Sequence, residues 1–304
     1  MFLTGGRRRL GWVAVMYACT ITVSQAAIRN NNHVFALSTQ CEAGLEAVAG
    51  ALGKPLPNPD TPVFQNRLPI HLYAKTLDFH DQVRQLQQAN GVPPLPAEGL
   101  PEGTVRPRNV YRLLEAACEG LYAIGKARGL QPPPEPESAL GKTTDDNYAR
   151  LWRLTQRMAA LVPPPQASDV ARELARAEKA LDNLASSQSL TTTEDITAPG
   201  TPSTSPRAML LVGYQVLHLT GRLQRQLNVE AIRPGSVKTG QVTLQDLYDL
   251  ARILNADLHR TLQALRQPGI TAAPAPESAD IETLARRWAQ LRDRLLALTG
   301  SEPV

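Results

Sequence analysis

The sequence is poor in aromatic residues and in cysteine. Aromatic side chains make up 5% of its 304 residues, and the chain contains three cysteines. A protein with so few rings must fill its core with leucine, alanine and valine, which are residues that globular proteins commonly bury.

The short motifs of common catalytic and cofactor sites are also missing. The sequence contains no His-Glu-x-x-His pattern, Gly-x-Ser-x-Gly elbow, glycine-rich phosphate loop, Cys-x-x-Cys-His motif or Glu-x-x-His pair. It therefore nominates no catalytic residue, metal ligand or cofactor. No run of lysine and arginine and no basic aromatic platform is present, so a nucleic-acid partner is not expected.

Residues 1–26 have the layout of a signal peptide. Three arginines at positions 7–9 precede the apolar stretch 10–23, and small residues at Ser24 and Ala26 would permit cleavage before Ala27. The apolar stretch is shorter than the roughly 20 residues that a membrane-spanning helix needs. We therefore expect a periplasmic or secreted protein. The alternative is an uncleaved N-terminal anchor, which would hold the chain at a membrane.

Removal of this segment changes the charge of the chain. The full sequence has a formal net charge of +4, and three of these charges belong to the arginines at positions 7–9, which leaves +1. The remaining composition is typical of a globular protein.

Helical periodicity dominates the sequence and predicts an all-α fold. Apolar residues recur at intervals of three and four, as in the series Leu37, Cys41, Leu45 and Val48. No segment shows the sustained apolar and polar alternation of a strand. Thr243 with Asp246 resembles a helix capping box, and Ser168 is a candidate cap. We predict eight helices, at 33–52, 66–90, 107–128, 143–162, 168–186, 206–228, 243–267 and 278–299.

The chain also shows an internal repeat, in which a segment from about 63 to 162 resembles one from about 205 to 299. Segment 105–111 resembles 242–248, and the sequence Ala-Arg-Leu-Trp ending at Trp152 resembles Ala-Arg-Arg-Trp ending at Trp288. A repeat of this length predicts a duplicated architecture. We expect two tandem units, each resembling a four-helix bundle, at 27–165 and 166–304. They are joined by the stiff prolines 163–165, and the Ser/Thr-rich loop 186–205 lies inside the second unit.

Two cysteines remain after the expected cleavage, Cys41 and Cys118. An oxidising compartment makes a disulfide between them a reasonable prediction. Each also lies on an apolar helix stripe, where a free buried cysteine would pack equally well. The sequence leaves both possibilities open.

The five histidines show no spacing typical of a metal site. Asp78, His80 and Asp81 form a small polar cluster, but Asp78 and His80 point in different directions on a helix, so we interpret this cluster as solvated helix surface. The arginines of the C-terminal half, Arg252 among them, alternate with polar residues and are also predicted to be solvated. Two histidines of the second unit, His218 and His259, could approach each other across neighbouring helices.

The remaining candidates for function come from the repeat. Tyr111 and Tyr248 begin equivalent helices and are expected to pack at bundle ends, and the two tryptophans are expected in the cores. The loops 91–106 and 229–242 are longer than most helix–helix connections, so they are the candidate contact surface.

Two functions are compatible with these features. The favoured one is an exported, non-catalytic helical protein that acts as a binding, sensory or scaffold module for an unknown protein or small-molecule partner. The alternative is an enzyme or cofactor-binding protein with a site between the two helical units.

Overall fold

The computed structural model describes residues 29–137, 139–188, 202–231, 234, 237–270 and 279–300, and these residues contain eight α-helices and no strand. The predicted all-α fold is confirmed. The signal peptide 1–26, most of the loop 186–205 and the predicted start of the last helix at 278 lie outside the described residues. The helices are α1 (Asn31–Ala51), α2 (Pro69–Ala89), α3 (Pro107–Lys126), α4 (Thr144–Met158), α5 (Ala167–Ser187), α6 (Pro206–Gln226), α7 (Leu244–Ala264) and α8 (Ile281–Thr299).

Short polar side chains fix where the helices begin. The predicted capping interaction between Thr243 and Asp246 at the start of α7 is confirmed. The backbone N–H of Thr243 donates to the Asp246 carboxylate over 2.8 Å. Ser168 does not cap α5. The cap residue is Gln166, whose backbone N–H donates to Asp169 at the third helical position over 2.8 Å. A carboxylate at that position suits the positive end of the helix dipole.

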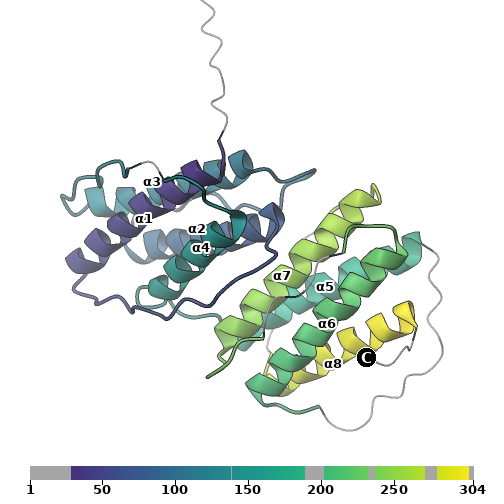
Figure 1. Ribbon diagram of the computed structural model, residues 1–304. Coiled ribbons are helices and arrows are strands. Elements are labelled where there is room, and N and C mark those ends of the chain that lie inside the picture. Colours follow the sequence, from purple (N-terminus) through teal and green to yellow (C-terminus); the bar gives the residue numbers. More distant parts are fainter. Residues whose placement is uncertain are drawn as a thin grey trace, which may run out of the picture.

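The eight helices form two units of four. In the first unit, α1 packs on α3 and α4, and α2 packs on the same two helices. In the second unit, α5 packs on α7 and α8, and α6 packs on those two. The units lie side by side in Figure 1, and the order of pairing is identical in both. The pairing is consistent with the two predicted helical units of four.

One helix pair joins the units within the described part of the chain, namely α2 and α7. All eleven residues from Ile70 to His80 in α2 are buried. A helix that faces a single core buries one stripe of its surface. Continuous burial therefore means that α2 is covered on both sides, by its own bundle and by the second unit.

This burial corrects the interpretation of the Asp78, His80 and Asp81 cluster as solvated. The side chains of Asp78 and His80 are at most 3% exposed, and Asp81 is half-buried. The Arg252 side chain on α7 is also largely buried, at 12% exposure, where we predicted a solvated face. The helical periodicity predicts that the face opposite the leucines meets water, whereas in the structure this face of α2 meets another helical unit.

None of the helices in the described ranges combines the length and apolar character needed to cross a bilayer.

Candidate functional site

A buried ionic network lies where α2 meets α7. The Lys75 Nζ atom is 2.6 Å from an oxygen of Asp249 and 2.9 Å from an oxygen of Asp78. Arg252 reaches back from α7 and places its Nε atom 2.8 Å from Asp78. Burial disfavours the charged form of Lys75, but the nearby carboxylates of Asp249 and Asp78 outweigh it and raise the pKa of Lys75. Lys75 therefore keeps its positive charge at neutral pH.

Glu173 on α5 extends this network into the second unit. Its carboxylate accepts a hydrogen bond from the Asn255 amide over 2.9 Å and pairs with Arg176 over 2.7 Å. Arg252 lies 3.6 Å from the same carboxylate. The polar faces of α2, α5 and α7 are thereby fixed against one another, which gives the junction a defined geometry.

His71 provides a second polar link across the junction. Its Nδ1 atom accepts the backbone N–H of Leu68 over 3.1 Å, and its Nε2 atom lies 2.9 Å from Asp257 of α7. An imidazole that accepts at Nδ1 carries its proton on Nε2, so neutral His71 donates to the Asp257 carboxylate. Both groups are satisfied without a second proton on the ring.

His218 and His259 have different environments. His218 is exposed on α6, whereas His259 is buried on α7. The Nε2 atom of His259 lies 3.0 Å from the carbonyl oxygen of Pro101, and its Nδ1 accepts the N–H of Ile270. Within the described part of the chain, no group of three or more His, Cys, Asp or Glu side chains could hold a metal ion.

The contact of His259 also places one of the long loops. Pro101 belongs to loop 91–106, and its carbonyl oxygen also accepts from Gln263 of α7 over 2.9 Å. Part of this loop is therefore in contact with the second unit of the same chain. In loop 229–242, the carbonyl oxygen of Glu230 accepts a hydrogen bond from Arg260. Both loops border the junction between the units.

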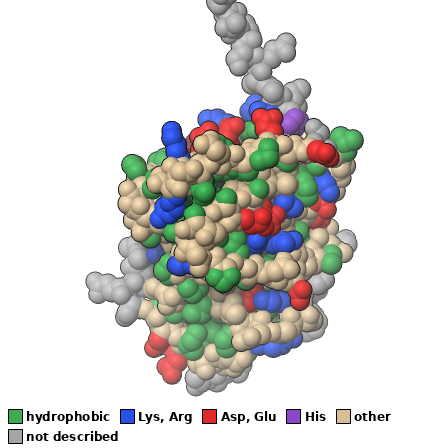
Figure 2. Space-filling model, turned by 90° about the vertical axis from the view of Figure 1, so that its left-hand side faces the viewer, with side chains coloured by type: hydrophobic (Ala, Val, Ile, Leu, Met, Phe, Trp, Pro, Cys, Tyr) green, Lys and Arg blue, Asp and Glu red, His purple; other side chains and the backbone are tan. Residues whose placement is uncertain are grey.

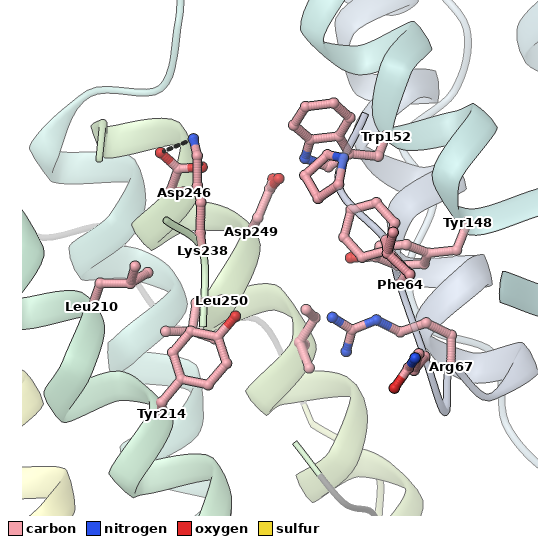
Figure 3. A pocket seen from close by; sticks show the side chains of 14 residues that line it. Phe64, Arg67, Tyr148, Trp152, Leu210, Tyr214, Lys238, Asp246, Asp249 and Leu250 are labelled. Carbon is pink, nitrogen blue, oxygen red and sulfur yellow. Dashed lines mark hydrogen bonds and ion pairs between the residues drawn. The ribbon is translucent and has the colours of Figure 1, made fainter. Parts of the chain in front are cut away.

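A small aromatic cleft opens beside the ionic network (Figure 3). Tyr148 and Trp152 reach it from α4, Phe64 from the segment before α2, and Tyr214 from α6. The Phe64 ring lies edge-on to Tyr148, with centroids 4.9 Å apart, and 5.9 Å from Trp152. Leucine and isoleucine side chains complete the wall on the second unit, namely Leu210, Leu250 and Ile253.

The dimensions of the cleft limit what it can accept. Its volume is about 70 Å³, which is smaller than the several hundred Å³ of a typical small-molecule pocket. A space of this size suits one aliphatic side chain or a small ring. Four aromatic residues meet here in a chain that has few of them.

Charged groups line the same cleft. The Lys238 Nζ atom binds both oxygens of Asp246 at 2.7 and 2.9 Å. Asp249 faces the cleft while it is paired with Lys75, and burial raises the pKa of Asp249 although Lys75 acts in the opposite direction. The guanidinium carbon of Arg67 lies 4.9 Å from the ring centroid of Tyr148 and 5.6 Å from that of Phe64.

The residues that correspond in the repeat, two tyrosines and two tryptophans, do not both reach this cleft in either pair. Tyr111 lies under the guanidinium of Arg29 in the first unit, and Tyr248 borders a different cavity. Trp288 is fully buried in the second unit, as expected, whereas Trp152 is buried beside the cleft. The repeated tryptophans therefore occupy unequal positions.

The structure pairs Cys41 of α1 with Cys118 of α3. Their Cα atoms are 5.3 Å apart, inside the range that a disulfide requires, although the residues are separated by 77 positions in the sequence. Both side chains are fully buried. The bond would join two helices of the first unit, away from the junction.

Sequence reasoning missed Phe64, Arg67 and Tyr214. Phe64 lies in a proline-rich segment without helical periodicity, and Tyr214 has no counterpart in the repeat. Arg67 falls inside the predicted helix 66–90, whereas the structure begins α2 at Pro69. The scarcity of aromatic residues was the one available signal, because it makes each ring outside a predicted core stripe a candidate.

No protein-family model matches the chain, and the comparisons with curated proteins and with solved structures found no match. The geometry of the junction between the units is therefore the basis for proposing a function.

Proposed function

We propose that this chain is an exported, non-catalytic binding protein of the periplasm or extracellular space, and that the aromatic cleft between its units holds a side chain of a partner polypeptide. The observation that carries the proposal is the convergence of Phe64, Tyr148, Trp152 and Tyr214 on one small cleft. Aromatic pockets that accept a single apolar side chain are typical anchor points of protein recognition.

Exposed apolar residues near the cleft support a protein partner. Of the four large hydrophobic side chains that are exposed among the described residues, Val63 lines the cleft at 80% exposure. Leu211 and Val237 follow and precede residues that line it. Figure 2 shows hydrophobic side chains spread over the drawn face, with a denser group in its lower half. Clustered exposed apolar groups favour contact with another protein.

The scaffold is suited to binding because the cleft walls come from two units that are locked together. The buried network of Lys75, Asp249 and Arg252 joins those units directly behind the cleft. A preorganised site loses less conformational entropy when a ligand binds.

Site-specific photo-crosslinking in the periplasm tests this proposal. A photoreactive residue replaces Val63 at the cleft, and a matched one replaces Leu140, which is 83% exposed in the loop between α3 and α4. We expect a discrete crosslinked partner from position 63 and none from position 140. Tyr214→Ala should lower the yield of that product about fivefold, since an aromatic contact contributes roughly 1 kcal/mol. Equal capture at both positions, or no effect of Tyr214→Ala, would reject the cleft as the site.

The competing proposal, an enzyme or cofactor-binding protein with a site between the units, is favoured by a second cavity of about 460 Å³. Asp81, Arg84, Arg172 and Tyr248 are among the residues that line it. Burial raises the pKa of Asp81, against the effect of the Arg252 guanidinium, and perturbed carboxyl groups in cavities are frequent in active sites. Metal analysis and an absorbance spectrum of protein purified from the periplasm distinguish the two proposals, because a stoichiometric cofactor would favour this one.

A further inference from the structure

Arg67 places a guanidinium group in the aromatic cleft without a carboxylate partner. Its side chain points from the first unit toward the second (Figure 3). The group stacks over the rings of Tyr148 and Phe64, and its Nε atom is buried without a hydrogen-bond acceptor. Within the part of the chain that the structure describes, no ion pair joins the Arg67 guanidinium to a carboxylate, unlike Lys75 and Lys238.

The other cations of the cleft are already neutralised. Lys238 is bound by Asp246, and Lys75, behind the cleft, is bound by Asp249. Ring contacts stabilise a guanidinium through its face, but they leave its in-plane N–H donors without acceptors. Arg67 is therefore the cation of the cleft whose hydrogen-bonding capacity is available to a ligand.

The backbone at Arg67 is held in place. Its N–H donates to the Asp145 carboxylate at the start of α4 over 2.7 Å. The preceding residue, Asn66, has a positive φ of 60°, a conformation that asparagine adopts more readily than most residues. Burial raises the pKa of Tyr214 in the second unit, and the nearby Arg67 guanidinium acts in the opposite direction. The donor is thus positioned before any ligand arrives.

We propose that Arg67 binds the C-terminal carboxylate of a polypeptide whose last side chain occupies the aromatic cleft. This inference rests on the proposed function. A guanidinium recognises a carboxylate through two parallel hydrogen bonds. The cleft has room for one side chain close to the guanidinium, and a C-terminal residue carries its side chain and its carboxylate on the same Cα atom. One residue of the partner can therefore fill both subsites.

Calorimetric titration with synthetic peptides tests the inference. The probes are pools of acetylated tetrapeptides that end in Ala, Val, Leu or Phe, each prepared as a free acid and as a C-terminal amide. We expect the best free acid to bind the mature protein about tenfold more tightly than its amide, because the amide removes the charge-assisted bonds. Arg67→Met should make acid and amide bind equally. Arg108→Met, at an exposed arginine on α3, should keep the preference.

The outcomes separate this inference from the proposed function. If acid and amide bind the unmodified protein equally well, the cleft binds peptides but Arg67 does not select a carboxylate. If no pool binds, polypeptide docking in the cleft is wrong and the inference falls with it. The comparison of acid with amide needs no variant, so it remains decisive should Arg67→Met fold poorly. Arg67→Lys gives a second test, since it keeps the charge but loses the planar fork and should weaken acid binding severalfold.

Discussion

Lys75 of α2 and Asp249 of α7 form a buried ion pair of 2.6 Å across the junction of the two units, with side chains that are 2% and 10% exposed. Replacing Lys75 with Met removes the cation and leaves Asp249 and Asp78 buried without it. We expect the free energy of unfolding to fall by about 3–5 kcal/mol, which is the usual cost of leaving a buried charge unpaired. Urea denaturation followed by circular dichroism measures the change.

A double variant separates the pair from general disruption. Asp249→Leu together with Lys75→Met removes both charges, and we expect it to recover part of the stability that Lys75→Met loses. Arg286→Ala, at an exposed position of α8, should change the free energy of unfolding by less than about 0.5 kcal/mol. Additive losses in the double variant would show that the two side chains are not coupled.

His80 makes the stability of the fold sensitive to acid. Burial lowers the pKa of His80, although Glu98 acts in the opposite direction. The unfolded chain, where the pKa is near 6.5, then binds a proton before the folded chain does. The contribution of His80 to stability is therefore complete above pH 6.5 and is lost as the pH falls toward the lowered folded value.

The measurement is the free energy of unfolding at pH 7.5 and pH 5.0. We expect the unmodified protein to lose more stability between these values than His80→Gln does, by up to about 1.4 kcal/mol per pH unit in the window. The buried carboxyl groups are the same in both proteins, so their effect on the pH dependence of stability cancels in this comparison. His218→Gln, at an exposed position of α6, is the matched histidine control. An identical pH dependence in His80→Gln would exclude His80 as the cause.

The sequence predicted the helices and their grouping because those depend on local periodicity and on loops. It failed at the junction because burial there depends on residues far apart in the chain. His71 contacts Asp257, 186 positions away, and Lys75 contacts Asp249, 174 positions away. A single amphipathic pattern assigns one buried face to each helix, so it could not show that α2 has two.

The cleft escaped prediction for a similar reason. Phe64, Tyr148 and Tyr214 come from three separate segments and meet only when both units are folded and joined. No spacing along one helix connects them. The long loops could be predicted as a contact surface because their length is read directly from the sequence. The structure places part of loop 91–106 against α7.

The predicted disulfide between Cys41 and Cys118 can be tested by its contribution to stability. A bond that closes a loop of this length restricts the unfolded chain and should contribute roughly 4 kcal/mol to the free energy of unfolding. We expect reductant and the double variant Cys41→Ser/Cys118→Ser to lower the stability by similar amounts. Thiol labelling of the exported protein under denaturing conditions provides the direct assay, in which two reactive thiols without reductant would contradict the bond.

Two glycines of α1 provide a matched test of how tightly the first bundle is packed. A Cβ atom built on Gly44 would lie 2.5 Å from the Tyr122 ring of α3, whereas one on Gly50 would meet nothing within 4 Å. Gly50→Ala should raise the free energy of unfolding by up to about 1 kcal/mol, because alanine loses less backbone entropy in a helix. Gly44→Ala gains the same term but must displace a rigid ring, which costs about 1–3 kcal/mol. We therefore expect Gly44→Ala to be less stable than Gly50→Ala by at least about 1 kcal/mol in thermal or urea unfolding. Equal stabilities would mean that Tyr122 rotates away freely, and that α1 and α3 are not held together by this contact.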